Sequence, residues 1–345
     1  MLTVIELLRN AYRRSFPVAI SNPYVGGTWG VKHLLAAPED RVSFSISVGD
    51  CTWETELVVE GGRIDGRSPE RALCDGRAIY ERPLYGESVN LAGQKISVGD
   101  SVALKVLHEL GLCPELNALV EQIVGFRTYT NYHLWTLREY GSKQSSDLFL
   151  HPTGTNAFSV LRNWRDKRDS RASYEWVREG LLDAFPDFFD DFDFEVAGQG
   201  VMLRVYVKGL PEPVPHHLAP DGFLVALLHL CAVAGAPSGG VLAIDEMENA
   251  LHPYAIRQLV SNFRNAADER DLTIVLATHS PVVLDQFASE PGHIYYMQPG
   301  AVVAPLRLDQ QRDLDWLSHF SIGKLYANLD FGAPQLPVEP LPGRN

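Results

Sequence analysis

Two acidic residues directly follow a short apolar run in the second half of the chain. Val241 to Ile244 predict a buried strand, and Asp245 and Glu246 come straight after it. Open α/β sheets bind their ligands at the carboxyl ends of such strands. There, one carboxylate can hold Mg²⁺, and another can orient or deprotonate the water that attacks a phosphate. Alone, the pair is weak evidence, because many strands of this kind end in an acid that only caps the next helix.

A histidine after the next predicted strand strengthens the case. Thr273 to Ala277 form a second apolar run, which is followed by Thr278-His279-Ser280-Pro281. Adjacent strands would bring His279 to the same edge as Glu246. An imidazole there can donate a hydrogen bond to a phosphate oxygen or to the attacking water. A lone histidine at a strand end is more often structural, but this ordered combination favours nucleotide hydrolysis.

The elements that must position these residues alternate between helix and strand. Such alternation predicts a parallel sheet covered by helices. The expected helices are Phe223–Val233, Tyr254–Arg270 and Val282–Phe287, and the expected strands are Val241–Ile244, Leu272–Ala277 and Ile294–Met297.

The first half of the chain has a different pattern. Residues 42–48 and 53–59 alternate between apolar and polar side chains around a Gly-Asp turn, which predicts an antiparallel meander. A hairpin is expected between Phe192 and Val207. Helices are expected at 4–14, 101–110, 115–124, 156–164 and 174–185. We therefore predict an α/β protein in which a parallel sheet flanked by helices is joined to an antiparallel β subdomain and a helical insertion.

Composition limits the class of protein. With 46% apolar residues, the 345-residue chain can bury a large core. No apolar stretch reaches the roughly 20 residues that cross a membrane, and the N-terminus does not have the pattern of a secretion signal. The four cysteines are widely spaced, which predicts neither a disulfide framework nor a zinc site and fits a cytoplasmic location.

Charge argues against a protein that coats nucleic acid. The formal net charge is −13, whereas phosphate binding needs clustered Lys and Arg. The one basic run, Arg162–Arg171, is diluted by Asp166 and Asp169. We interpret it as a solvated helix end.

The stretch Leu242–Phe287 resembles a known family. Its motifs are similar to the Walker B, D-loop and switch-histidine segments of AAA-family ATPases of the SMC/OLD-like ABC class, and they read Ile244-Asp245-Glu246-Met247-Glu248-Asn249-Ala250-Leu251-His252-Pro253 and Ala277-Thr278-His279-Ser280-Pro281. Weaker similarities at Pro152–Leu161 and Leu317–Gly323 extend the resemblance to much of the chain. It implies an ABC/SMC-type P-loop NTPase head. The expected parts are an N-terminal lobe at 1–150, an ATPase lobe at 151–332 and a Pro-rich tail at 333–345.

The resemblance also implies roles for individual residues. Asp245 would coordinate Mg²⁺ through water, Glu246 would be the hydrolytic base, and His279 would sense the γ-phosphate of ATP. Glu248 to Leu251 would form the D-loop, which touches the partner subunit of a dimer. Residues expected at the nucleotide are Asp221, Gly222, Asn249 and Ala250.

Two departures from the family pattern stand out. Pro220 stands where the signature segment usually has a serine, although proline suits a first helical turn. The 345 residues contain no Gly-x-x-x-x-Gly-Lys-Ser/Thr phosphate loop, and Gly27–His33 has the wrong spacing and is interpreted as a turn. Because Met1–Leu8 resembles the helix that follows that loop, we expect a missing upstream segment. A degenerate ATPase is the competing interpretation.

Three functions compete. The first is a Mg²⁺-dependent ATPase that forms a homodimer or a paired subunit and acts on an effector protein or DNA. The second is a non-hydrolysing regulatory or scaffold subunit that uses the D-loop surface. The third, an OLD-type nuclease, would need a further metal-binding domain after Gly332, which we do not expect.

Overall fold

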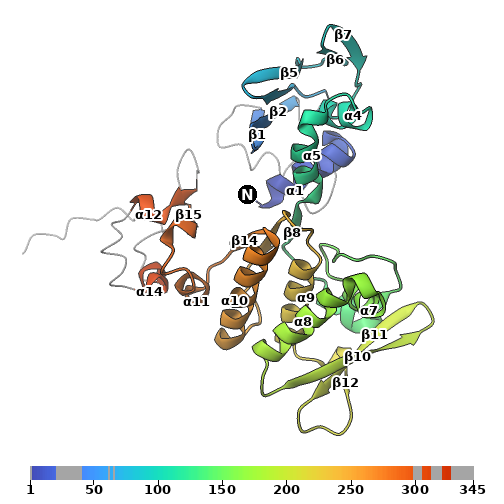
Figure 1. Ribbon diagram of the computed structural model, residues 1–345, viewed down its shortest axis with the longest axis vertical. Helices are drawn as coiled ribbons and strands as arrows, with labels where there is room; N and C mark the ends of the chain where they lie inside the picture. The colour runs from blue at the N-terminus through green and yellow to red at the C-terminus, as the bar shows by residue number, and fades with distance from the viewer. Residues whose placement is uncertain are drawn as a thin grey trace, which may run out of the picture.

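The computed structural model describes residues 2–20, 41–60, 63–64, 67–297, 305–311 and 321–327. Figure 1 shows a parallel sheet near the centre, an antiparallel β subdomain at one end, a helical and hairpin insertion at the other, and a small C-terminal unit to one side. The turn expected at Gly27–His33, the tail at 333–345 and residues 317–320 of the C-terminal motif lie outside the described residues.

The parallel sheet has the order β14 (Thr273–Ala277), β13 (Val241–Asp245) and β8 (Arg127–Tyr129). Both outer strands run parallel to β13. Helices α9 (Asp221–Ala234) and α10 (Pro253–Arg270) pack beside it. The predicted combination of a parallel sheet, covering helices and an antiparallel subdomain is confirmed.

One predicted parallel strand is wrong, and another was missed. The apolar run Ile294–Met297 contributes only β15 (Tyr295–Tyr296), which pairs antiparallel with β16 (Leu306–Arg307). The third strand of the parallel sheet is β8 instead. Its three residues, Arg-Thr-Tyr, are too few and too polar to give a strand pattern.

The insertion packs on the buried face of α9. It consists of helices α7 (Ala157–Asp166) and α8 (Arg171–Ala184) and a sheet of β9 (Ser142–Lys143), β10 (Phe189–Ala197), β11 (Gly200–Val207) and β12 (Val214–Pro215). Phe185, Phe188 and Phe189 all lie with ring centroids within 5.8 Å of the Phe223 ring. The predicted hairpin is confirmed by the antiparallel register of β10 and β11.

The antiparallel subdomain has a separate core. Its strands are β1 (Arg41–Val48), β2 (Cys51–Glu60), β3 (Arg63–Ile64), β4 (Glu70–Cys74), β5 (Arg77–Arg82), β6 (Ser88–Leu91) and β7 (Gln94–Ser97). Its helices are α1 (Leu2–Arg13), α2 (Phe16–Ile20), α4 (Ala103–Glu109) and α5 (Asn117–Gly125). Two bonds tie α1 to the parallel sheet: Arg9 Nη1 donates to the Phe126 carbonyl at 2.8 Å, and Thr128 Oγ1 donates to Glu6 at 3.2 Å.

The remaining elements connect these parts. They are α6 (Leu134–Tyr140), α11 (Pro281–Asp285), α12 (Leu308–Gln311), α14 (Ile322–Ala327) and four 3₁₀ turns at Pro114–Leu116, Arg168–Ser170, His216–Leu218 and Pro291–His293. None of the helices in the described ranges is both long and apolar enough to cross a membrane.

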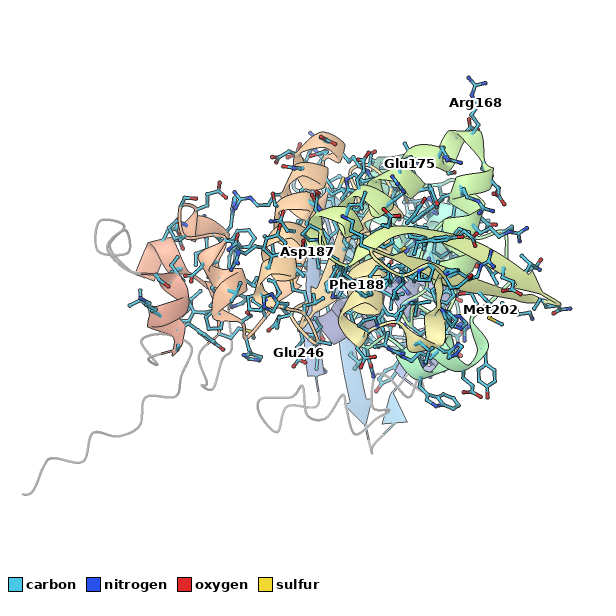
Figure 2. All side chains as sticks on the ribbon, turned by 90° about the horizontal axis from the view of Figure 1, so that it is seen from below. Arg168, Glu175, Asp187, Phe188, Met202 and Glu246 are labelled. Atoms are coloured by element: carbon cyan, nitrogen blue, oxygen red, sulfur yellow. A yellow bond between two sulfur atoms is a disulfide. The ribbon has the colours of Figure 1, made fainter. Side chains whose placement is uncertain are left out.

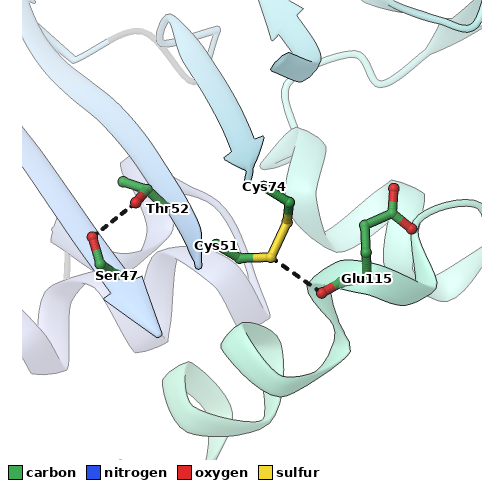
Figure 3. Close-up of a disulfide and its surroundings, with 5 residues drawn as sticks. All are labelled: Ser47, Cys51, Thr52, Cys74 and Glu115. Atoms are coloured by element: carbon green, nitrogen blue, oxygen red, sulfur yellow. Dashed lines mark hydrogen bonds between the residues drawn. A yellow bond between two sulfur atoms is a disulfide. The ribbon is translucent and has the colours of Figure 1, made fainter. Parts of the chain in front are cut away.

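A disulfide joins two cysteines that the sequence did not predict to pair. Cys51 on β2 lies directly opposite Cys74 on β4, with their Cα atoms 4.1 Å apart (Figure 3). The Cys51 sulfur also contacts the Glu115 carbonyl at 3.4 Å. The two cysteines are 23 residues apart in the sequence, and only the register of the strands brings their thiols together. No local sequence pattern therefore predicts this pairing. The expectation of no disulfide was therefore wrong, and the cytoplasmic location remains a prediction.

The subdomain is organised around a buried ion pair. Arg82 Nη2 lies 2.6 Å from Glu70 Oε1, and neither side chain is exposed. Glu70 also accepts hydrogen bonds from the Ala103 and Leu104 amides at the start of α4. Burial raises the pKa of Glu70, whereas the Arg82 charge and these amides oppose that shift. The carboxylate thus joins β4, β5 and α4.

Replacing Arg82 with Met should lower the free energy of unfolding by about 3–5 kcal/mol, because it leaves a buried carboxylate without its counter-charge. Urea denaturation measures the loss. The matched control is Arg41→Met, which removes the exposed pair with Glu56 and should cost less than about 1 kcal/mol. Similar losses in the two variants would contradict the role given to the Glu70–Arg82 pair.

Candidate functional site

The carboxyl edge of β13 and β14 brings the two predicted acids and the predicted histidine together. Asp245 pairs in register with Ala277, and the Glu246 amide donates to the Ala277 carbonyl at 2.8 Å. His279 follows Ala277, the last residue of β14, by two residues. Figure 2 shows Glu246 at the rim of the molecule, away from Arg168 and Glu175 of the insertion.

Electrostatics at this edge favour a cation. Burial raises the pKa of Asp245, and the adjacent Glu246 carboxylate raises it further. A cation between them would relieve both effects. The described residues hold no cluster of three or more His, Cys, Asp or Glu side chains able to bind a metal. Mg²⁺ commonly uses one or two carboxylates together with water and substrate phosphates, so Asp245 and its neighbour fit that ion.

Backbone conformation turns the D-loop sharply away from β13. Glu246 has φ +46° and Ala250 has φ +64°, both in the left-handed region. Asn249 Nδ2 donates to Glu246 Oε2 at 2.7 Å. Left-handed residues other than Gly cost free energy and concentrate at functional sites. The hydrogen bond from Asn249 thus holds the Glu246 carboxylate within the same loop.

Glu248 joins the D-loop to the segment that carries the histidine. Its carboxylate accepts hydrogen bonds from Thr278 Oγ1 and from the His279 amide, each at 2.8 Å. The sequence placed Glu248 only among D-loop residues that face a partner. Its bridging role depends on strand register, and the sequence alone gives no signal for it.

The start of α9 lies against the D-loop of the same chain. A Cβ atom added to Gly222 would stand 2.5 Å from the Ala250 carbonyl oxygen, so only glycine permits this approach. Arg138, on α6, donates to the carbonyls of His217 and Ala219 and lies 2.5 Å from Asp221 Oδ1. The predicted residues Asp221, Gly222 and Ala250 are thus brought together, and Arg138 is an additional residue that the sequence did not reveal.

A buried histidine on α9 holds the acidic loop through the Met247 carbonyl. His229 Nε2 lies 3.1 Å from the Met247 carbonyl, and its Nδ1 lies 3.1 Å from the Tyr132 hydroxyl. Burial lowers the pKa of His229 from 6.5 to about 4. The only sequence signal was a polar residue inside the otherwise apolar run Phe223–Ala234. Met247 is fully buried beside it, which explains an apolar residue directly after the acidic pair.

The other edge of β14 is unpaired within the described part of the chain. β14 pairs with β13 alone, and Val275 is 38% exposed. β14 is rich in branched apolar residues, as covered strands of parallel sheets usually are, yet none of its residues is fully buried. The backbone N–H and C=O groups along this edge could pair with one more strand beside β14.

Comparisons with known proteins relate the chain to a family of ATPase domains. The family model described as AAA domain, putative AbiEii toxin, Type IV TA system, matches residues 69–285. An ATP/GTP phosphatase of Helicobacter pylori is 34% identical over 94 residues, which are 26% of this chain and 25% of that protein. The energy-coupling factor transporter ATP-binding protein EcfA of Methanoculleus marisnigri is 33% identical over 98 residues, which are 28% of this chain and 33% of that protein. The chain thus matches a quarter to a third of the length of these relatives.

Two solved structures overlap with the chain at low identity. The SMC head bound to the C-winged helix domain of ScpA has a TM-score of 0.40 and 10% identity, covering 76% of this chain and 77% of that one. The SMC head domain from Thermotoga maritima has a TM-score of 0.33 and 10% identity, covering 75% and 74%.

The buried state of His229 predicts a pH dependence of stability. The folded state keeps the imidazole neutral, whereas the unfolded state binds a proton near pH 6.5. The free energy of unfolding should therefore fall as the pH drops from about 6.5 to about 4, by about 3 kcal/mol in total. His229→Gln should remove this part of the pH dependence, and the exposed His293→Gln should keep it. Urea denaturation at several pH values decides; equal pH profiles for wild type and His229→Gln would be the contrary result.

The contact between α9 and the D-loop predicts a steric effect at Gly222. Gly222→Ala should lower the free energy of unfolding by about 1–3 kcal/mol, because the new methyl group meets a backbone oxygen that cannot rotate away. The control is Gly125→Ala on α5, where an added Cβ meets nothing within 4 Å and should be neutral or slightly stabilising. Thermal unfolding measures both. Equal melting temperatures for the Gly222 variant and wild type would show that the approach is not tight.

Proposed function

Because the chain belongs to the family described as AAA domain, putative AbiEii toxin, Type IV TA system, we propose that it is an ATP-binding and ATP-hydrolysing subunit of the ABC/SMC-like kind. The observation that carries this proposal is the joint position of Asp245, Glu246 and His279 at the carboxyl edge of adjacent parallel strands. That edge is where open α/β sheets bind ligands.

Each residue has a distinct task in this proposal. Asp245 would hold Mg²⁺ through water, and the ion would neutralise charge on the phosphates of ATP. Glu246, steadied by Asn249, would take the proton of the attacking water. His279 would donate to the γ-phosphate. Glu248 would keep His279 in register with the acids.

The start of α9 would act on nucleotide in a second subunit. Asp221 is exposed, and the N-terminus of a helix attracts phosphate. Pro220 gives no hydroxyl group there, so the backbone amides of α9 would supply the contact. Asn249 and Ala250 are exposed beside them on the D-loop. The positions of Asp221, Gly222, Asn249 and Ala250 support the proposal of a homodimer, or of a pair with another ATPase subunit, joined across the D-loop.

We propose that the phosphate loop is supplied by a segment other than these 345 residues. No Gly-x-x-x-x-Gly-Lys-Ser/Thr occurs in the 345 residues. The unpaired edge of β14 could accept the strand that precedes such a loop. α1 lies close to β8 through the bond between Glu6 and Thr128, which suits a helix that follows the loop. An upstream segment would thus complete both the sheet and the site.

A non-hydrolysing regulatory or scaffold subunit is the second candidate. Pro220 and the lack of a phosphate-loop lysine favour it. Electrostatics favour an effector protein over DNA as the partner, because the net charge is −13 and Arg162, Arg165 and Arg171 of the basic run are paired with nearby acids.

The hydrolysis proposal predicts the effect of removing the base. In a protein extended upstream to include an in-frame phosphate loop, Glu246→Gln should keep ATP binding while kcat falls by roughly 10²-fold or more. Glu269→Gln, at an exposed position near the end of α10, is the matched control and should leave kcat unchanged. Phosphate release and nucleotide binding are measured on the same samples. Wild-type turnover in the Glu246 variant would remove Glu246 from the mechanism, and absence of turnover in every form would favour the scaffold.

A further inference from the structure

A short C-terminal helix, beyond the residues that match the family model, reaches the switch histidine. α14 is held on α11 by Asp285, whose carboxylate accepts from the Ser321 hydroxyl at 2.8 and 3.0 Å and from the Gly323 amide at 2.8 Å. Gly323 is buried, and any Cβ there would collide with the Pro281 carbonyl oxygen. These contacts therefore fix the position of the segment Ser321–Ala327 on α11.

Apolar packing also holds α14 in this position. Ile322 and Leu325 are buried in a small cluster with Ile294 and Leu308, and Leu284 and Phe287 pack against it. The position of α14 is thus fixed on two sides, by hydrogen bonds to Asp285 and by burial of its apolar face.

Tyr326 extends from α14 to the histidine ring. Its hydroxyl lies 2.7 Å from His279 Nδ1, and the two rings are inclined by 28°. Glu248 holds the backbone amide of His279 from the opposite segment. The main chain and the ring of the histidine are therefore held by two different parts of the fold, and Nε2 is the ring nitrogen not engaged by Tyr326.

We propose that Tyr326 is a positioning residue for His279, whose hydroxyl donates to Nδ1 and so places the ring proton on Nε2. In a neutral imidazole one nitrogen accepts and the other carries the proton, so an acceptor at Nδ1 makes Nε2 the donor. This is the form that can donate to a phosphate oxygen. That last step rests on the proposed ATPase function, whereas the tautomer and ring orientation do not.

The tautomer can be measured on the 345-residue chain without nucleotide. Long-range ¹H–¹⁵N spectra at pH 8 of protein labelled in histidine, with His279 assigned from the His279→Gln variant, should show a proton on Nε2 and a hydrogen-bonded Nδ1. Tyr326→Phe should move the Nδ1 resonance downfield, toward an acceptor without a partner. Tyr295→Phe, which removes an exposed hydroxyl from the same unit, should leave the His279 signals unchanged.

A second variant reaches the same contact by another route. Gly323→Ala should lift α14 from α11 and reproduce the Nδ1 shift of Tyr326→Phe, although Tyr326 itself is intact. Protonated Nδ1 in wild type, or identical His279 signals in wild type and Tyr326→Phe, would overturn the proposal whatever the ATPase assays give.

Kinetics separate this proposal from the proposed function. In a hydrolysing form that includes a phosphate loop, Tyr326→Phe should lower kcat by about tenfold, the order of one lost hydrogen bond, with little change in KM. Unchanged kcat would overturn the catalytic part of the role. If no form hydrolyses ATP but the spectra are as expected, the ATPase proposal fails and the positioning of His279 by Tyr326 stands.

Discussion

The in-register pairing of β13 with β14 is the constraint on which the site depends. The ladder continues one residue beyond Asp245, to the bond from the Glu246 amide to the Ala277 carbonyl. Two loops thus begin from fixed and adjacent points. The left-handed conformation of Glu246 then directs the acidic loop away from the strand, and Glu248 returns to hold the amide of His279. A change in register by one residue would separate the acids from the histidine.

Support for this edge comes from three directions, each through a different interaction. Beneath it, Nε2 of buried His229 donates to the Met247 carbonyl, which ties the acidic loop to α9. Beside it, Gly222 lets the start of α9 lie directly against Ala250, so the signature-like segment and the D-loop of one chain are in contact. On the far side, Tyr326 reaches His279 from the C-terminal unit. Movement of any of these elements would displace the acidic loop or His279.

Apolar patterning was sufficient to predict the main strands and helices of this fold. β13 and β14 are continuous apolar runs, and the alternation in β1 and β2 is unambiguous. β8 was missed because three residues are too few to show a repeating pattern of apolar and polar side chains. Ile294–Met297 was assigned to the wrong sheet because an apolar run does not specify which strand it pairs with. The Cys51–Cys74 pairing depends on register for the same reason.

The acids and the histidine could be found from the sequence because each follows a recognisable strand. Their supports could not. Glu248, His229, Arg138 and Tyr326 act through contacts between residues 18 to 83 positions apart, which no local pattern encodes. Gly222 was noted for its place in a motif, but the need for glycine arises from the Ala250 carbonyl of a distant loop.

We propose that this edge binds Mg-ATP when a phosphate loop completes it. The decisive measurement is calorimetric titration of Mg-ATP into the 345-residue chain, into the upstream-extended protein and into its Asp245→Ala variant. We expect negligible heat from the chain alone, because the triphosphate would face Asp245 and Glu246 without the amides and lysine of the loop. The extended protein should bind, and Asp245→Ala should weaken binding only when Mg²⁺ is present. Micromolar binding by the 345-residue chain that is lost on Asp245→Ala would show that the site is complete without the loop and would contradict this account.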